Sequence, residues 1–359
     1  MNPRLLPLLF LLGRPFSPLY SGVMRLRPWA YRKGYLETKA LPRPVISIGN
    51  ITLGGTGKTP LVMAVAEWFK RQGLRVAVVT RGYGGSIGKG PVLVSKGEGA
   101  VISPHKAGDE PVMMAERMYG IPVVAGSDRF NAGLFAIQEL DAQIILLDDG
   151  FQHLALKRDI DILLLSARRL FGTGKVFPGG DLREPLSAIS RAAAIVITDS
   201  QIFGPDQIEA CRQMLDVLAP ERPVFFSQTK TKAIRDLNPS TPVFAFCGIG
   251  SPEAFFEMCA ETWTEIRGKK AFRDHHVYTL RDINEIATEA LKAGASCVVT
   301  TAKDAVKVTG IWSKATAREG KILPLMVFEI EAAPEPELFN FIKSQLPPLT
   351  EVGASYFTG

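Results

Sequence analysis

Three groups of polar residues in this sequence have residue types and spacing that suit chemistry on a phosphate group. The first is GNITLGGTGKTP, residues 49–60, which follows a short apolar run and precedes a segment of helical periodicity. It ends in Gly57, Lys58 and Thr59, as the phosphate-binding pattern G-x-x-x-x-G-K-[ST] requires, but Thr52 stands where that pattern has its first glycine. In such a loop, backbone N–H groups converge on phosphate oxygens, the lysine neutralises the phosphates and the threonine hydroxyl binds Mg²⁺.

The absent first glycine does not exclude a phosphate site, because Gly54 and Gly55 still supply flexible backbone near the expected phosphate position. Pro60 falls in the first helical turn, where its missing N–H costs little. The alternative is a glycine-rich turn that holds no ligand. We expect the nucleotide to contact the whole loop, which consists of Thr52, Leu53, Gly54, Gly55, Thr56, Gly57, Lys58 and Thr59.

A pair of carboxylates, Asp148 and Asp149, follows four apolar residues in the segment IILLDDGFQH. A phosphate-binding loop needs an acidic partner at the end of another buried strand to organise Mg²⁺. Adjacent carboxylates at such a position are costly unless a cation neutralises them. The pair therefore predicts a magnesium site shared with Thr59; the alternative is that Asp149 and Gly150 form a helix cap or a surface turn.

The third group joins Asp109, in the segment GDEP, to two histidines far along the chain. His275 and His276 lie beside Asp274 in FRDHHVY. Adjacent histidines point in different directions, so at most one is expected to face a given site, and metal binding is not expected without further ligands at suitable spacing. A histidine can relay a proton near neutral pH, which suits activation of a hydroxyl. The alternative for Asp109 is a helix N-cap.

Short apolar runs alternate with segments of helical period from residue 45 onward, which predicts an α/β fold with a mostly parallel sheet of the P-loop NTPase type and helices on both faces. Such sheets bind ligands beyond the carboxyl ends of their strands. The expected strands are Val45–Gly49, Val76–Thr80, Pro122–Ala125, Ile144–Asp149, Ile160–Ser166 and Ala194–Thr198. The expected organisation is an N-terminal segment (1–43), a P-loop core (44–227), a linker (228–240) and a smaller C-terminal α/β domain (241–359).

The positive charge of the chain is concentrated at its start. Residues 1–43 contain eight basic side chains and one acid, Glu37, which leaves 34 basic and 35 acidic residues in the rest of the chain. The segment also carries six aromatic residues and the apolar run Leu5–Gly13, which is too short to span a bilayer. We interpret it as an interfacial segment that meets anionic lipid; the alternative is an arm packed on the protein's own core. No nucleic-acid partner is expected, and no protein partner can be inferred.

Eight segments, in this order along the chain, resemble the tetraacyldisaccharide 4'-kinases of lipid A biosynthesis. They are GGTGKTP, RGYGG, GDEP, DDGFQH, LREP, FCGIGSP, FRDHHVY and TAKDAVK, and the resemblance runs from about residue 5 to residue 345. The family transfers the γ-phosphate of ATP to the 4'-hydroxyl of a tetraacylated glucosamine disaccharide 1-phosphate at the cytoplasmic face of the inner membrane. The resemblance implies the same activity, ATP and Mg²⁺, an acylated disaccharide lipid as substrate, and a peripheral position on that membrane.

The resemblance also implies roles for single residues. It assigns Lys58 and Asp149 to catalysis, and Asp109 to activation of the acceptor hydroxyl together with a histidine of the DHH motif. We assign that histidine to His275, with His276 as the alternative. The implied metal-site residues are Thr59, Asp148, Asp149, Gln152 and Glu184; which of the two aspartates contacts the metal directly is left open.

Two other classes of nucleotide-binding protein are less consistent with the sequence. The membrane-bound switch ATPases of the Min and Par type carry a lysine immediately before GGTGKT, where this chain has Leu53. A GTP-dependent switch would need the guanine-reading pattern N-K-x-D, which TAKD does not match. A binding module without enzymatic activity would leave Asp109 and the two histidines unexplained.

Overall fold

The structure, a computed structural model, describes residues 6–347 except residues 87, 89, 233–237 and 315–322. Within these residues the framework is one 12-stranded sheet, in the order β10-β9-β11-β12-β8-β7-β6-β1-β5-β2-β4-β3. Neighbouring strands run parallel except in the β3–β4 and β8–β12 pairs. The strands are β1 (Val45–Asn50), β2 (Val76–Thr80), β3 (Val92–Ser95), β4 (Val123–Ala125), β5 (Ile144–Asp148), β6 (Ile160–Ser166), β7 (Ala194–Thr198), β8 (Val224–Lys232), β9 (Val243–Cys247), β10 (Ile266–Ala271), β11 (Cys297–Thr301) and β12 (Leu325–Pro334).

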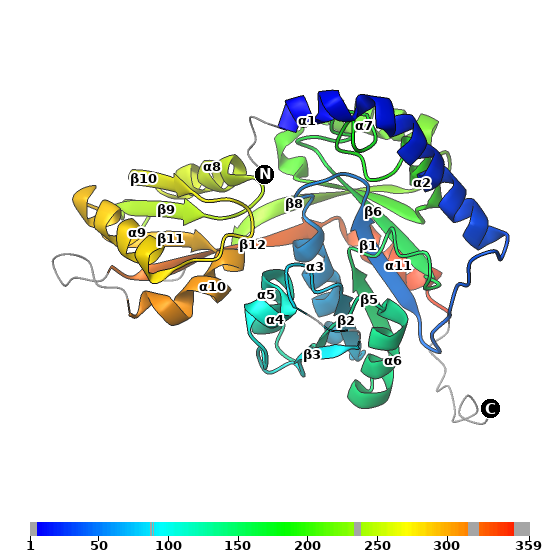
Figure 1. The fold of residues 1–359 in the computed structure, drawn as a ribbon, viewed down its shortest axis with the longest axis horizontal. Coiled ribbons are helices and arrows are strands. Elements are labelled where there is room, and N and C mark those ends of the chain that lie inside the picture. The colour runs from blue at the N-terminus through cyan, green and yellow to red at the C-terminus, as the bar shows by residue number, and fades with distance from the viewer. Residues whose placement is uncertain (1–5, 87, 89, 233–237, 315–322, 348–359) are drawn as a thin grey trace.

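The helices divide between two ends of this sheet (Figure 1). They are α1 (Leu6–Gly13), α2 (Ser17–Arg32), α3 (Lys58–Arg71), α4 (Pro104–Ala107), α5 (Asp109–Arg117), α6 (Arg129–Leu140), α7 (Pro205–Leu218), α8 (Pro252–Thr262), α9 (Leu280–Lys292), α10 (Ala302–Trp312) and α11 (Pro336–Gln345), with short 3-10 helices at Arg14–Phe16, Leu186–Arg191 and Ser200–Ile202. We call β1–β7 with α3–α7 the N-terminal lobe, and β9–β11 with α8–α10 the C-terminal lobe. Strands β8 and β12 run between the lobes (Figure 1).

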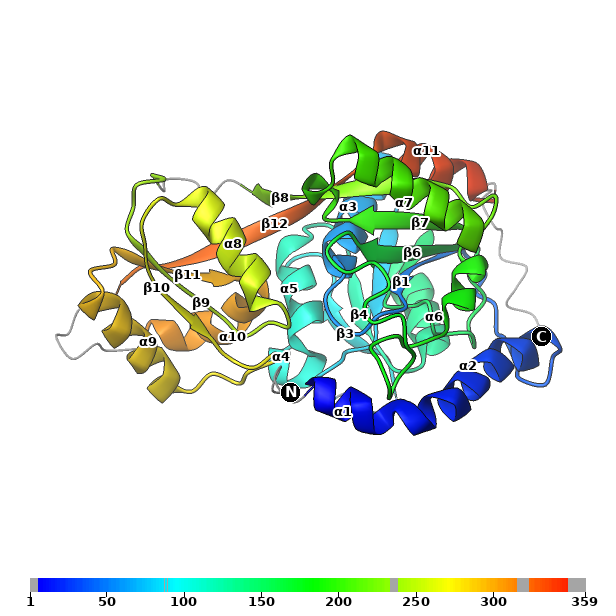
Figure 2. The same cartoon turned by 90° about the horizontal axis from the view of Figure 1, so that it is seen from above.

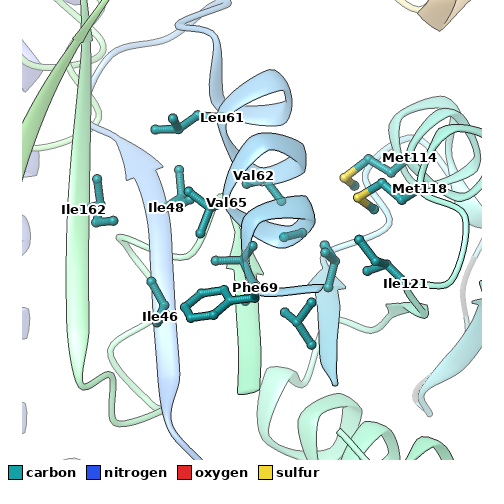
Figure 3. Packing of buried hydrophobic residues seen from close by; sticks show 14 of the residues in the cluster. Ile46, Ile48, Leu61, Val62, Val65, Phe69, Met114, Met118, Ile121 and Ile162 are labelled. Carbon is teal, nitrogen blue, oxygen red and sulfur yellow. The ribbon is translucent and has the colours of Figure 1, made fainter. Parts of the chain in front are cut away.

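Both faces of the sheet in the N-terminal lobe are covered, which explains why the first four residues of β5, before Asp148, are all apolar. Ile144 and Leu146 belong to the cluster packed against α3, in which Phe69 is fully buried (Figure 3). Ile145 and Leu147 point to the opposite face and pack with the residues of α6. Successive strand residues point to opposite faces, so a strand covered on both must be apolar at every position. The predicted fold class is confirmed.

The structure differs from the predicted domain boundaries in two places. Strand β8 continues to Lys232 and pairs with β12, so residues 228–232 of the predicted linker are part of the sheet; residues 233–237 lie outside the described chain. Helix α11, which the sequence assigned to the C-terminal domain, returns to the N-terminal lobe. Leu338 and Ile342 are fully buried in the cluster around α3, and Phe339 stacks on Trp68 with ring centroids 5.2 Å apart.

Helices α1 and α2 form an arm along the outside of the N-terminal lobe (Figure 2). One side of the arm contacts the lobe: the Tyr20 hydroxyl donates to the carbonyl of Arg183 at 3.2 Å. The other side exposes apolar residues, with Leu12, Leu19 and Leu26 at 65%, 74% and 60% exposure. Each helix of the described residues falls short of the length and apolarity needed to cross a membrane. One side of the arm is therefore packed on the protein, as the alternative interpretation expects. The other side exposes apolar residues, as an interfacial segment would.

We expect Leu338→Ala to destabilise the N-terminal lobe, although the residue lies close to the end of the chain. Its side chain is fully buried, and truncation of such a residue typically lowers the free energy of unfolding by about 2–5 kcal/mol. Urea denaturation followed by tryptophan fluorescence, which includes Trp68, measures this loss. The control is Val217→Ala on α7, which is 81% exposed. Equal stability of the two variants would contradict the packing of α11.

Candidate active site

The glycine-rich loop joins β1 to α3. Gly54 and Gly57 have positive φ angles of 105° and 71°, a region that residues with a side chain rarely adopt. At Gly57 a Cβ atom would also lie 3.3 Å from the side chain of Thr198. The Thr198 hydroxyl donates to the carbonyl of Thr56 at 3.0 Å. The end of β7 therefore braces the loop immediately before the N-terminus of α3.

Thr52, which replaces the first glycine of the pattern, occupies extended backbone. It forms an antiparallel bridge with Leu182, and the side-chain amide of Asn50 donates to its carbonyl at 2.9 Å. The N–H of Leu53 donates to the carbonyl of Asp181 at 2.7 Å. A β-branched residue suits such a conformation. The position therefore has no need of glycine, which explains the departure from the strict pattern.

Asp148 lies at the end of β5 and is 3% exposed. Its Oδ2 accepts a hydrogen bond from the Thr80 hydroxyl at 3.5 Å, while its Oδ1 is buried with no hydrogen-bond partner among the described residues. Burial, together with the charges of Glu110 and Asp149, raises the pKa of Asp148 to about 7. A buried carboxylate oxygen without a partner is destabilising, and a bound cation would satisfy it.

Asp149 follows with a positive φ of 52°, which turns its side chain toward two cations. Lys58 Nζ lies 3.6 Å from its carboxylate, and Arg183 Nη1 donates to the two carboxylate oxygens at 3.0 and 2.8 Å. Burial opposes ionisation, but Lys58 and Arg183 lower the pKa of Asp149 overall. The two adjacent aspartates thus have opposite pKa shifts: at Asp148 burial and the neighbouring carboxylates outweigh the nearby cations, whereas at Asp149 the cations outweigh burial.

Asp148, Asp149 and the hydroxyl of Thr59 fit a magnesium ion chemically, since Mg²⁺ prefers oxygen ligands and takes few of them from the protein. The described part of the chain contains no group of three or more His, Cys, Asp or Glu residues that could hold a metal by itself. Phosphate oxygens and waters would therefore have to complete the coordination of the ion. This is the usual arrangement for a magnesium nucleotide.

The other two metal-site predictions have different surroundings. The Gln152 amide donates to the carbonyl of Asn50 at 2.8 Å, which places it beside the loop. Glu184 is 3% exposed, and both of its carboxylate oxygens accept from Arg191, at 2.7 and 2.9 Å. As the structure stands, Glu184 is engaged by an arginine, while its neighbour Arg183 reaches Asp149.

Asp109 and His275 meet across the two lobes. Asp109 is the first residue of α5 and 6% exposed. His275 Nδ1 lies 3.1 Å from each of its carboxylate oxygens. Gly108 occupies the N-cap position of α5, and among the backbone N–H groups of the described residues the Asp109 side chain accepts only that of Glu110, at 3.1 Å. The capping alternative therefore explains little of this carboxylate's environment.

His276 points away from Asp109. Its Nε2 lies 3.3 Å from the Asp282 carboxylate, and its ring stacks on Phe272 with centroids 4.6 Å apart. Adjacent histidines do face different directions, as the sequence analysis expected. Of the two candidates, the geometry brings His275 to the predicted site.

Three cations near the site were not predicted from the sequence. Lys303 and Lys307 of α10 approach His275 and Asp109, with Lys307 Nζ 3.5 Å from Asp109 Oδ2. Arg183 binds Asp149 as described above. All three belong to segments that the sequence analysis named, TAKDAVK and LREP. The spacing of four residues between the lysines places them on one face of a helix, which is the signal that could have indicated them.

We expect Asp148→Asn to stabilise the protein. A raised carboxyl pKa means that the folded state binds the proton more tightly than the unfolded state does, so the ionised form destabilises the fold increasingly between about pH 4 and pH 7. The substitution should raise the free energy of unfolding by about 1–3 kcal/mol at pH 8, and by less at pH 5. Denaturation by urea at both pH values measures the effect.

Asp149→Asn is the matched control, because its pKa is lowered and the same substitution should destabilise the fold at pH 8. Equal effects of the two substitutions would contradict the opposite environments of the aspartates.

Comparison with known proteins supplies the family. The family model described as tetraacyldisaccharide-1-P 4'-kinase matches residues 9–347. The tetraacyldisaccharide 4'-kinase of Desulfotalea psychrophila is 41% identical, over 84% of this chain and 88% of that protein; the one from Desulfatibacillum aliphaticivorans is 37% identical, over 93% and 92%. A crystal structure of the "apo" form of LpxK from Aquifex aeolicus in complex with ATP covers 93% of this chain and 98% of its own, with a TM-score of 0.73 and 30% identity. The chain belongs to the tetraacyldisaccharide-1-phosphate 4'-kinase family.

Proposed function

We propose that Asp109 and His275 activate the acceptor hydroxyl in the phosphoryl transfer that this chain catalyses. As a member of its family, the chain is a kinase that phosphorylates the 4'-position of a tetraacyldisaccharide 1-phosphate with ATP, a late step of lipid A biosynthesis. The observation that carries the proposal is the 3.1 Å contact of His275 with both oxygens of Asp109. The next residue, Glu110, lies close enough to Asp148 to raise the pKa of that carboxyl. Through Glu110, the segment that carries Asp109 is thus within electrostatic range of the carboxylates at the phosphate site.

Asp109 suits the role of proton acceptor. Burial opposes its ionisation, but His275, Lys303 and Lys307 together lower its pKa to about 2, so it is a carboxylate at neutral pH. As the hydroxyl oxygen bonds to the γ-phosphorus, the bond from that phosphorus to the β–γ bridging oxygen breaks, and the hydroxyl proton passes to Asp109. Such a weak base suffices because phosphoryl transfer requires mainly positioning and charge neutralisation.

Lys58 follows the loop directly and would neutralise the phosphates of ATP, since it heads α3 and its only ion pair among the described residues is with Asp149. Thr59, Asp148 and Asp149 would hold Mg²⁺, with Gln152 beside them. When bound, this ion neutralises charge on the β- and γ-phosphates. Glu184 could join these ligands only after leaving Arg191.

We expect Asp109→Ala to lower transfer of labelled γ-phosphate to the acylated disaccharide by about 10²–10⁴-fold, while ATP still binds, because the contacts of Asp109 do not include the glycine loop. His275→Ala should lower kcat in the same direction. His276→Ala is the matched control and should retain most activity, since His276 contacts Asp282 instead. Vigorous ATP hydrolysis without a labelled lipid product would contradict the assigned acceptor, and loss of activity in His276→Ala alone would reverse the assignment of the histidine.

We also propose that the α1–α2 arm binds the cytoplasmic face of the inner membrane, where a lipid with four acyl chains is presented. The exposed leucines of the arm and its basic residues suit the boundary between headgroups and acyl chains. Because the other side of the arm is hydrogen-bonded to the N-terminal lobe, insertion would bring the whole enzyme to the surface. The arm would then act as a peripheral anchor.

Replacing Leu12, Leu19 and Leu26 together by serine should weaken binding to vesicles that contain anionic lipid. Loss of exposed apolar area removes the insertion energy but leaves the hydrogen bonds of the arm intact, so the fold is retained. Sedimentation with vesicles measures the partition, and Val217→Ser, at a residue of comparable exposure on α7, is the control. Undiminished binding of the triple variant would place the membrane contact elsewhere.

A further inference from the structure

Helix α10, in the same lobe as His275 and the opposite lobe to Asp109, presents two lysines to the Asp109–His275 pair. Lys303 and Lys307 are separated by four residues, so they lie one turn apart on the same face of the helix. Their side chains are 16% and 11% exposed. Buried lysines are uncommon unless they are paired, and both of these are paired with groups of the site.

Lys307 forms ion pairs with both Asp304 and Asp109. Its Nζ lies 2.9 Å from Asp304 Oδ1 and 3.5 Å from Asp109 Oδ2. Asp304 is fully buried and accepts from the N–H of Gly248 and the hydroxyl of Thr301, both at 2.8 Å. The position of the ammonium group therefore depends on a carboxylate that cannot move without losing these bonds.

The turn at Gly248 explains why Asp304 can approach so closely. A Cβ atom on that residue would lie 2.9 Å from the Tyr278 hydroxyl and 3.2 Å from Asp304 Oδ1. The ammonium group of Lys307 lies over the ring of the same tyrosine, with Nζ 5.3 Å from the ring centroid. The FCGIGSP and TAKDAVK segments thus form one buried support for Lys307.

Lys303 acts on the histidine. Its Nζ lies 3.3 Å from His275 Nε2 and 3.0 Å from Glu110 Oε1. An ammonium group has only hydrogen atoms to donate, so Nε2 has to accept and the proton of a neutral imidazole has to be on Nδ1. That proton points to Asp109. The contact therefore selects the tautomer of His275 that donates to the carboxylate.

We infer that Lys303 and Lys307 are positioning residues for the transfer reaction: Lys307, fixed by Asp304, holds the Asp109 carboxylate in place, and Lys303 keeps His275 in the tautomer that donates to it. This inference rests on the proposed role of Asp109. The lysines come from the C-terminal lobe and Asp109 from the N-terminal lobe. The base is therefore complete only when the two lobes are in contact.

The charged groups around Asp109 determine the direction of the expected pH effect. On α5 the neighbour is Glu110; from the loop after β10 come Asp274 and His275; from α10 come Lys303 and Lys307. Removing an ammonium group from this set leaves less positive charge to stabilise the ionised carboxylates. The pKa of Asp109 then rises, and the carboxylate is lost at a higher pH than in the parent enzyme.

Lys307→Met tests the inference, because methionine fills the space of the stem and removes the charge. Because Asp109 loses the ion pair that holds it in place, we expect kcat to fall at least about tenfold with an unchanged KM for ATP. The acidic limb of the pH–kcat profile should also move upward by about 1–3 pH units, which leaves Asp109 ionised at neutral pH. Lys292→Met, at an exposed lysine of α9, is the control and should match the parent enzyme. Lys303→Met should lower kcat as well. It becomes the test variant if Lys307→Met does not fold.

Asp304→Asn provides a double-mutant cycle. If Asp304 acts through Lys307, its substitution should lower kcat in the parent enzyme and have little further effect in the Lys307→Met background. Equal effects in both backgrounds would overturn this link. An unmoved pH profile in Lys307→Met and Lys303→Met, or a raised KM for the lipid with unchanged kcat, would overturn the inference. An active Asp109→Ala enzyme would instead overturn the proposed function on which it rests.

Discussion

The antiparallel pairing of β8 with β12 is the constraint on which the relation between the lobes depends. The chain passes from the N-terminal lobe to the C-terminal lobe along β8 and returns along β12, and the six residue pairs from Ser227–Pro334 to Lys232–Glu329 fix the register of the two strands. Because β8 also pairs with β7, and β12 with β11, the sheet is continuous through both lobes. A shift in this register would move α10 relative to α5.

The helix that carries Asp109 is tied to this ladder at its other end. Arg117, the last residue of α5, forms a 2.6 Å ion pair with Glu329 of β12, and α11 then packs the end of the chain against α3. Asp109 at the start of α5 meets His275 and Lys307 from the other lobe. The same short helix is thus held to the connecting strand at one end and to the C-terminal lobe at the other, so the geometry of the Asp109–His275 pair follows that of the connection.

Three aspartates of the site have different pKa shifts because the fold gives each a different set of neighbours. Asp148 lacks a cationic contact and has a raised pKa, whereas Asp149 contacts Lys58 and Arg183 and has a lowered one. Asp109, with an imidazole and two ammonium groups around it, is lowered furthest, to about 2. A carboxylate destabilised in the free protein and satisfied by a ligand suits an ion-binding role, and one that is always ionised suits proton acceptance. With the proposed role in ion binding, stability and function oppose each other at Asp148.

Much of this protein was determined by the sequence alone, through local patterns. Strands apolar on both faces were predicted with their observed bounds at residues 76–80, 160–166 and 194–198, because burial on both sides leaves no other composition. Edge strand β10, with the sequence IRGKKA and alternate residues exposed, has no such pattern and was not predicted. The loop and the Asp148–Asp149 pair were recognisable because their chemistry comes from neighbouring residues. Tertiary structure decided the rest: which of the two histidines contacts Asp109, the return of α11, and the approach of Lys303 and Lys307. Each of these depends on contacts between residues distant in sequence, and a local pattern carries no information about which distant surface a side chain will meet.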